Sequence, residues 1–166
     1  MFKSPLYFMY YVFILILFLL DQGSKFAVRQ NFEYGESVPV VGKVFHITYV
    51  QNTGASFGIF AEYTNVLTYF TLIILIGIAG YVIYLRRSKK IADSKAEKLM
   101  SPALALILAG GFGNAADRLI FGFVTDMFDF RIWPVFNVAD IYICVGCVML
   151  LVGILKSDFK GKNDAK

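Results

Sequence analysis

The sequence predicts an α-helical membrane protein in which four transmembrane helices carry a small β-sheet and loop region on the outer face. The first observation is composition, because 58% of the 166 residues are hydrophobic and the mean hydropathy is +0.64. Soluble domains are usually about 45–50% apolar. The second observation is a set of four apolar runs, over residues 4–20, 65–85, 99–116 and 138–155. The third is a β-rich stretch at residues 37–50.

The four apolar runs have the length of membrane spans. A transmembrane helix needs about 20 residues, with a range of about 17–25. A soluble core built from these runs would leave almost no polar chain to cover it. We therefore expect one integral membrane domain over residues 1–166. Its helices are expected at about 4–27, 65–85, 99–117 and 138–155, and its outer segments at about 28–64 and 118–137.

The first run has the basic start and apolar stretch of a signal peptide. It is followed at residues 21–25 by DQGSK, which is not a small-x-small cleavage site, and further spans come later. We therefore interpret it as an uncleaved first helix.

The distribution of basic residues predicts the orientation of the helices. Eleven Lys and Arg residues precede the first run, separate the second from the third, or follow the fourth, whereas five lie in the other two segments. Because basic residues are enriched on the cytoplasmic side, both termini are expected in the cytoplasm. The basic loop at residues 86–98 is interpreted as a topology signal, so the net charge of +4 requires no nucleic-acid partner.

The longer outer segment is expected to form a small sheet on the membrane surface. Within its β-rich stretch, Gly42 and Lys43 can form a two-residue hairpin turn with glycine first. A turn-rich stretch, NTGASFG, follows at residues 52–58.

Cysteine and histidine chemistry is disfavoured. Cys144 and Cys147 form a C-x-x-C that could be redox-active or half of a metal site, but it lies in the fourth apolar run without a second ligand pair. We interpret the two as small packing residues. His46 is the only histidine and lies in a predicted strand, which argues against Ser–His and Cys–His catalysis.

Polar residues on three helices are predicted to lie at one depth. At about 1.5 Å per residue, Asp21 lies roughly 25 Å from the inner end of its run, and Asn114 and Asp140 lie roughly 22 Å from theirs. All three therefore stop a few ångströms short of the outer edge of a hydrocarbon core about 30 Å thick. Ionisable groups within spans usually face the bundle interior and mark function.

Several neighbouring polar residues are candidates for the same site. Asp21 and Lys25, spaced i, i+4, can form an interfacial ion pair or anchor the first helix beneath the site. Asp117 and Arg118 follow the small-residue run GGFGNAA, which lets a backbone or a substrate approach closely. They can form a scaffold in which Arg118 holds lipid phosphate or peptide carbonyls. The asparagines are turn or cap residues, or they orient a substrate peptide; they are Asn52, Asn114 and Asn137.

Three aspartates then leave three chemistries open. Two carboxylates that share a site cannot both ionise easily, so the pKa of one rises and the pair can activate water against an amide. Any two of Asp126, Asp129 and Asp140 could form such a pair. Alternatively, Asp117, Asp126 and Asp129 could bind Mg²⁺ beside a lipid phosphate. The third possibility is a proton-coupled carrier with Asp21 and Asp140 as relays.

The chain also resembles a known family, the bacterial lipoprotein signal peptidases (type II signal peptidases). The resemblance rests on five motifs in this order: DQGSK at 21–25, NTGASFG at 52–58, GGFGNAADR at 110–118, VTDMFD at 124–129 and FNVAD at 136–140. One departure is Thr125, where an apolar residue is expected; its hydroxyl could hydrogen-bond Asp126.

The resemblance implies an aspartic endopeptidase of the bacterial cytoplasmic membrane that needs no metal or cofactor. Its substrates would be prolipoproteins carrying a diacylglyceryl group, cut before the lipidated cysteine near the outer face, in contact with membrane lipid, by a monomer. Matching the motifs places the catalytic pair at Asp126 and Asp140 and leaves Asp129 as a supporting or solvated neighbour. The resemblance implies binding or supporting roles for Asn52, Gly54, Asn114, Asp117, Arg118, Asn137, Asp21 and Lys25.

Overall fold

The computed structural model describes residues 5–54, 64–87 and 95–163. These residues form four helices, and each contains a segment long and apolar enough to cross a membrane. The predicted fold class is therefore confirmed. The helices are α1 Pro5–Asn31, α2 Thr64–Arg87, α3 Lys95–Phe121 and α4 Val138–Asn163.

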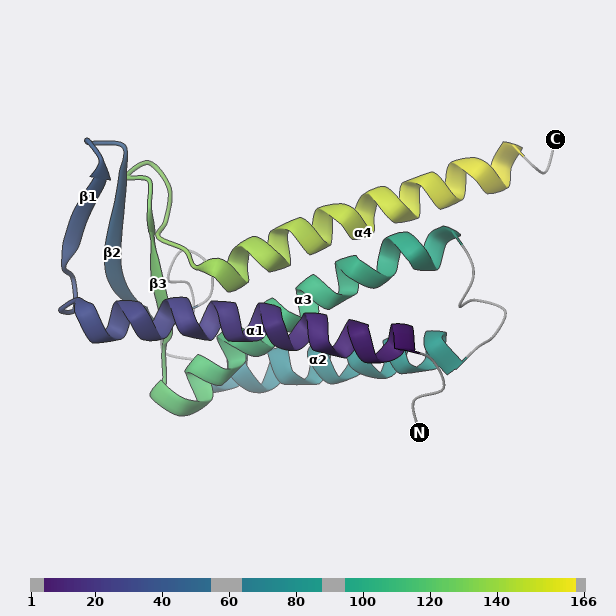
Figure 1. Ribbon diagram of the computed structural model, residues 1–166, viewed down its shortest axis with the longest axis horizontal. Helices are drawn as coiled ribbons and strands as arrows, with labels where there is room; N and C mark the ends of the chain where they lie inside the picture. The colour runs from purple at the N-terminus through teal and green to yellow at the C-terminus, as the bar shows by residue number, and fades with distance from the viewer. Residues whose placement is uncertain (1–4, 55–63, 88–94, 164–166) are drawn as a thin grey trace.

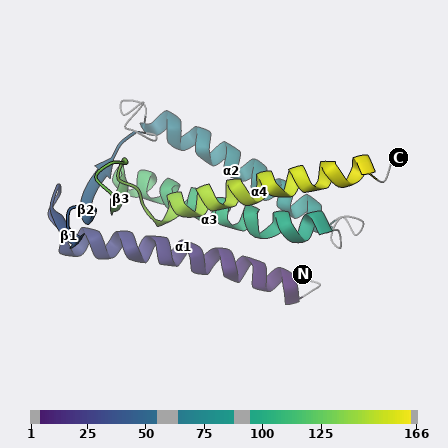
Figure 2. The same ribbon diagram turned by 90° about the horizontal axis from the view of Figure 1, so that it is seen from above.

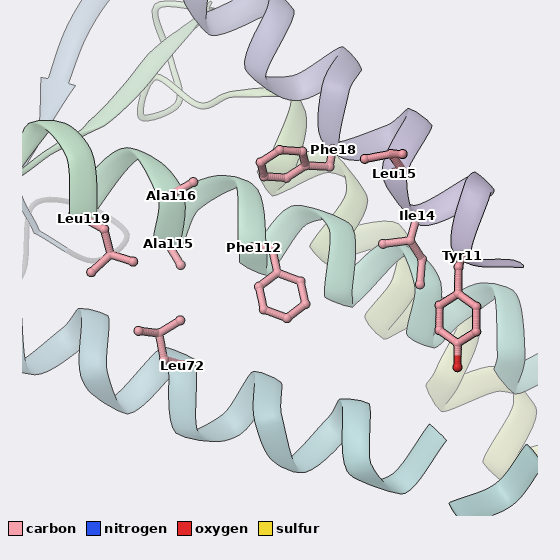
Figure 3. A pocket seen from close by; sticks show the side chains of 9 residues that line it. All are labelled: Tyr11, Ile14, Leu15, Phe18, Leu72, Phe112, Ala115, Ala116 and Leu119. Carbon is pink, nitrogen blue, oxygen red and sulfur yellow. The ribbon is translucent and has the colours of Figure 1, made fainter. Parts of the chain in front are cut away.

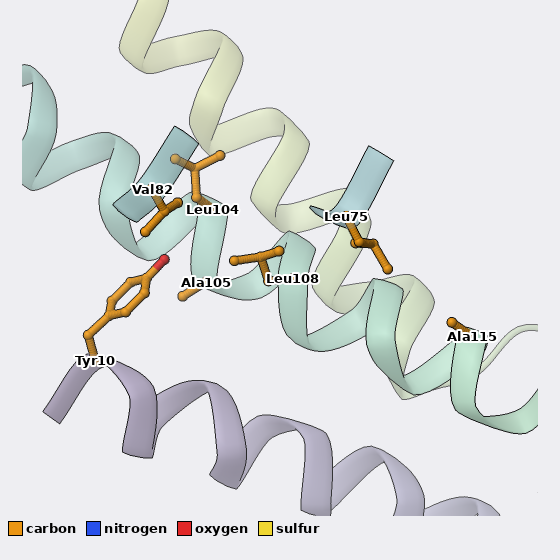
Figure 4. Close-up of a cluster of buried hydrophobic side chains, with 7 residues drawn as sticks. All are labelled: Tyr10, Leu75, Val82, Leu104, Ala105, Leu108 and Ala115. Atoms are coloured by element: carbon orange, nitrogen blue, oxygen red, sulfur yellow. The ribbon is translucent and has the colours of Figure 1, made fainter. Parts of the chain in front are cut away.

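Helix α3 is the centre of the bundle and packs against the other three helices (Figures 1 and 2). Its buried residues include Leu104, Ala105 and Leu108, which meet Tyr10 of α1 and Leu75 of α2 (Figure 4). Helix α1 begins and α4 ends at one end of the bundle, and the sheet lies at the other end (Figure 1). The sheet therefore lies at the end of the bundle opposite the start of α1 and the end of α4.

Two glycines of α3 allow close approach near that end. A Cβ at Gly110 would overlap the carbonyl oxygen of Ala139 on α4, and a Cβ at Gly113 would overlap the carboxylate of Asp21 on α1. The close approach predicted for this small-residue run is thus used for helix packing. It brings α1 and α4 against the same turns of α3.

The sheet has three antiparallel strands in the order β1-β2-β3. They are β1 Ser37–Val41, β2 Phe45–Asn52 and β3 Val124–Asp129. The predicted hairpin joins β1 to β2, but the prediction of a two-residue turn was wrong. Gly42, Lys43 and Val44 all lie in the turn, and the register shifts between Pro39 and Val41.

All four helices end beyond their predicted positions. Helix α1 continues past residue 27 to Asn31, and α3 continues past residue 117 to Phe121. Helix α2 continues past residue 85 to Arg87, and α4 past residue 155 to Asn163. Because α1 is longer, Arg29 lies on the helix rather than in the outer segment. The cysteines differ from their interpretation as packing residues, because Cys144 and Cys147 are both free and exposed on α4.

An apolar groove runs between α1 and α2 over α3 (Figure 3). On α3 it is lined by Phe112, Ala115, Ala116 and Leu119. At about 100° per residue, this face lies roughly 150° around the helix from Asn114. The groove therefore faces away from the predicted polar site. Its other lining residues are Tyr11, Ile14, Leu15, Phe18 and Leu72.

Candidate active site

Asp126 and Asp140 reach one polar site from two different elements. Asp126 is in β3, paired with Val50 of β2, and it is only 2% exposed. Asp140 is in the first turn of α4. Strand β3 and helix α4 are consecutive elements, and both lie at the sheet end of the bundle (Figure 1).

Asn137 connects the two aspartates. Its Nδ2 donates to Oδ1 of Asp126 at 2.6 Å. Its Oδ1 accepts the backbone N–H of Asp140 at 3.0 Å, and its own N–H donates to Oδ2 of Asp140 at 3.2 Å. These last two bonds form a capping box, in which the N-cap and third helical residues bond reciprocally. The residue that caps α4 therefore also binds the carboxylate on β3.

Two further amides each donate to one carboxylate. Asn52 Nδ2 donates to Oδ2 of Asp126 at 2.9 Å, and the Asn52 Oδ1 accepts the N–H of Gly54. Asn114 Nδ2 donates to Oδ1 of Asp140 at 2.8 Å. The three predicted asparagines thus all contact the aspartate pair. Because each amide oxygen has another donor, each NH₂ group faces a carboxylate.

Burial, and secondarily the negative charge of Asp140, raise the pKa of Asp126 to about 6. Hydrogen bonds from Asn52 and Asn137, and the positive charge of Lys25, oppose the rise. Asp126 therefore holds a proton at a pH where an ordinary aspartate has lost it. This is the behaviour expected for one member of a carboxylate pair.

Lys25 is fully buried between two other aspartates, Asp21 and Asp117. Its Nζ is 3.0 Å from Oδ2 of Asp21 and 3.6 Å from Oδ2 of Asp117. It also donates to Oδ1 of Asn114 at 2.8 Å. The i, i+4 ion pair of Asp21 and Lys25 is therefore present, and the sequence did not predict Asp117 as its third member.

Both of these aspartates also bind backbone. Asp117 Oδ2 accepts the N–H of Thr125 in β3 at 2.9 Å. Asp21 Oδ1 accepts the N–H of Ala139 in α4, also at 2.9 Å. Each carboxylate therefore fastens one of the two elements that carry Asp126 and Asp140.

Arg29 is a member of the site that sequence reasoning missed. Its Nη1 donates to Oγ1 of Thr125 at 2.9 Å and lies 3.4 Å from Oδ1 of Asp117. The suggestion that Thr125 bonds Asp126 was wrong, because adjacent strand residues face opposite sides and this hydroxyl meets Arg29. The periodicity of Asp21, Lys25 and Arg29, at i, i+4 and i+8, was the available signal.

Arg118 and Gly54 also meet at the site. Arg118 Nη2 donates to the carbonyl oxygen of Gly54 at 2.7 Å, which is one of the two roles considered for it. Asp117, by contrast, pairs with Lys25 and Arg29. The remaining residues of the second motif, 55–58, lie outside the described part of the chain.

Asp129 belongs to a separate cluster. It is three residues from Asp126 on the same strand, and therefore on the other face. Its carboxylate accepts bonds from the Thr48 hydroxyl and the Arg131 N–H, both at 2.8 Å, and it pairs with the Arg131 guanidinium. It is buried rather than solvated.

The alternative metal site needs Asp117, Asp126 and Asp129 to converge. Asp117 is paired with two cations, and Asp129 lies on the opposite face of β3 from Asp126. Across residues 5–54, 64–87 and 95–163, no group of three or more His, Cys, Asp or Glu side chains is placed to hold a metal ion. That ligand set is therefore not assembled.

Similarity to known proteins covers most of the chain. The family described as signal peptidase (SPase) II matches residues 13–156. The lipoprotein signal peptidase of Moorella thermoacetica is 43% identical over 82% of this chain and 85% of its own. That of Haemophilus influenzae strain Rd is 39% identical over 90% of this chain and 86% of its own.

The fold is also similar to two bacterial membrane enzymes whose structures were determined by the in meso method. The first, at 2.3 Å resolution, has a TM-score of 0.78 and 27% identity over 90% of this chain and 89% of its own. The second, at 1.9 Å, has a TM-score of 0.75 and 28% identity over 89% and 93% of the two chains. The chain therefore belongs to the signal peptidase II family, whose members include the lipoprotein signal peptidases.

Proposed function

We propose that the chain is an aspartic endopeptidase that removes the signal peptide from diacylglyceryl-modified bacterial prolipoproteins, cutting before the lipidated cysteine. One observation carries the aspartic mechanism: the carboxylates of Asp126 and Asp140 accept hydrogen bonds from one residue, Asn137, through its side-chain amide and its backbone N–H respectively, and the pKa of Asp126 is raised. Family membership supports the peptidase activity. The names of the relatives support the substrate class.

The proposed reaction uses one proton shared by the pair. The ionised carboxylate takes a proton from water as the water oxygen attacks the scissile carbonyl carbon. The protonated carboxyl donates a hydrogen bond to the carbonyl oxygen as negative charge develops there. When the tetrahedral intermediate collapses, the C–N bond breaks and the amide nitrogen receives the transferred proton. A carboxylate pair can supply both roles only while it holds one proton.

Other residues have supporting roles in this proposal. Asn52 and Asn137 orient Asp126, and Asn114 and Asn137 orient Asp140. Arg118 is a candidate for binding the substrate backbone, because its Nε is buried and has no hydrogen-bond partner within the described residues. Gly54, whose carbonyl accepts from Arg118, would lie beside the substrate chain. Asp21 and Asp117, paired with Lys25, bind the backbone next to Asp140 and Asp126 respectively.

The position of the pair suits a lipid-modified substrate. Asp140 is at the start of a membrane-spanning segment and Asp126 is in the sheet that adjoins it. This depth gives access to water while acyl chains and the signal helix remain in the bilayer. We place the site at the outer face of the bacterial cytoplasmic membrane, with both termini cytoplasmic, in a multi-pass monomer that contacts membrane lipid.

The test is cleavage of a purified lipid-modified prolipoprotein by the Asp126→Asn and Asp140→Asn variants. We expect both to lose cleavage by about 10²–10⁴-fold, which is the contribution of general acid–base catalysis. Both variants should retain a cooperative thermal transition in detergent. Cleavage at the wild-type rate by either variant would contradict the proposal. Inhibition by a chelator, reversed by added Mg²⁺, would favour a metal-dependent enzyme instead.

A further inference from the structure

The two carboxylates of the pair are placed by a repeated arrangement. The residue directly before Asp126 is Thr125, and its backbone N–H is bound by Asp117. The residue directly before Asp140 is Ala139, and its backbone N–H is bound by Asp21. In each case a buried side-chain carboxylate holds the peptide group one residue before a member of the pair.

Lys25 joins these two carboxylates. Its ammonium group lies 3.0 Å from Asp21 and 3.6 Å from Asp117, and it bonds Asn114, which in turn donates to Asp140. An ammonium group has three N–H donors, and three oxygen partners lie within 3.6 Å of this one. A single buried cation is therefore linked to β3 through Asp117, and to α4 through both Asp21 and Asn114.

The energetics indicate that this ion cluster is poorly explained by stability alone. Asp21, Asp117 and Lys25 are fully buried, and with Arg29 they balance to zero net charge. Burying ions is costly, and replacing a buried ion cluster with apolar residues is often neutral or stabilising. The geometry, in contrast, has a direct use, because catalysis by a pair depends on the relative position of its members.

We propose that Lys25, together with Asp21 and Asp117, forms a positioning cluster that fixes the relative position of Asp126 and Asp140. This inference rests on the function proposed above. The three residues are fully buried, and they act through Thr125, Ala139 and Asn114.

The decisive variant is Lys25→Met combined with Asp21→Asn. It removes one positive and one negative charge, so the remaining Asp117–Arg29 pair stays balanced, and Asn can still accept the Ala139 N–H. We expect the melting temperature in detergent to be retained while kcat falls about 100-fold, the size of effect that a 1 Å misplacement can produce. KM for the lipid-modified prolipoprotein should stay within about twofold, because the residues that contact substrate are intact.

Three comparisons complete the test. Lys25→Arg keeps a cation and should recover kcat to within about tenfold of wild type. Arg131→Met removes a cation from the other face of β3 and should leave kcat unchanged. A folded Lys25→Met/Asp21→Asn variant with wild-type kcat, or a kcat loss in all variants proportional to the unfolded fraction, would overturn the inference.

Two further variants keep the inference testable in every case. If the double variant does not fold, Asp21→Asn alone is read instead, and a folded Asp21→Asn variant with wild-type kcat would overturn the inference. Asp140→Asn is assayed in parallel to separate the two proposals. If Asp140→Asn cleaves normally, the proposed function fails. If Asp140→Asn is inactive but the folded cluster variants match wild-type kcat, only the positioning role fails.

Discussion

Asp126 and Asp129 are on the same short strand, yet their surroundings give them opposite acidities. Asp126 faces Asn52, Asn137 and Asp140, and burial with a neighbouring negative charge raises its pKa to about 6. Asp129 is also buried, which alone would raise its pKa. The Arg131 N–H, the Thr48 hydroxyl and the Arg131 guanidinium outweigh burial and hold the pKa of Asp129 below its ordinary value of 3.8.

The difference shows that the partner of a buried carboxylate decides its chemistry more than burial does. Asp129 has a guanidinium at 3.3 Å, so its charge is compensated. Asp126 has two neutral amides and a second carboxylate as neighbours, so no guanidinium compensates its charge. A compensated carboxylate is a structural group, whereas an uncompensated one can exchange a proton near neutral pH.

The largest predicted effect separates the two aspartates by activity. Asp129→Asn should retain cleavage of a lipid-modified prolipoprotein to within about threefold, because Asp129 faces away from the pair. Asp126→Asn, measured beside it, should lose about 10²–10⁴-fold. An Asp129→Asn enzyme that folds but has lost as much activity as Asp126→Asn would show that the two faces of β3 are not functionally separate.

An intermediate effect is expected in the pH dependence of the wild-type enzyme. The value of kcat/KM reports ionisations of the free enzyme. If the pair must hold one proton, kcat/KM should fall about tenfold per pH unit above pH 6, where Asp126 loses it. A profile flat from pH 5 to pH 8 would contradict the shared proton.

The Asn52→Leu variant tests whether Asp126 causes the alkaline limb of that profile, and Arg131→Met is its control. Its amide donates to Asp126 and lowers the pKa of this carboxyl. Removing the donor should therefore move the alkaline limb to higher pH. Arg131→Met, on the face of β3 opposite Asp126, should leave the pH of the alkaline limb unchanged.

The smallest effect concerns stability at low pH. The pKa of Asp129 is lowered by folding, so its contribution is present above pH 3.8 and is lost as pH falls further. Arg131→Met should remove part of it, about 1 kcal/mol or less, because the Arg131 side chain is 45% exposed. The difference in melting temperature between Arg131→Met and wild type should therefore shrink below pH 3.8. A melting-temperature difference that grows below pH 3.8 would contradict a stabilising interaction between Arg131 and the ionised Asp129.

The helices and the β1–β2 hairpin could be predicted because their signals are local. Apolar runs of membrane length specify the spans, and a β-rich stretch with a glycine turn specifies the hairpin. Strand β3 was not predicted, since VTDMFD lacks simple alternation and its polar residues are buried by partners far away in sequence. Arg29 was missed for a related reason, because ending α1 near residue 27 placed it in a loop.

The site residues were predictable as a set but not as a network. Depth along the helices brought Asp21, Asn114 and Asp140 to one level, and their contacts place them together. Nothing in the spacing of the motifs indicates that Lys25 binds both Asp21 and Asp117. That contact requires α1 and α3 to be packed together, which the sequence of either helix alone does not describe. The Asn137–Asp140 spacing was a readable cap signal.

The capping box at the start of α4 couples secondary structure to site assembly. Asn137 and Asp140 hold each other only while the first turn of α4 is wound, and Asn137 also holds Asp126. Fraying of this single turn would therefore dismantle the carboxylate pair while the rest of the bundle stayed folded. The hydrogen-exchange protection of one amide, the N–H of Asp140, would then measure the fraction of molecules whose site is assembled.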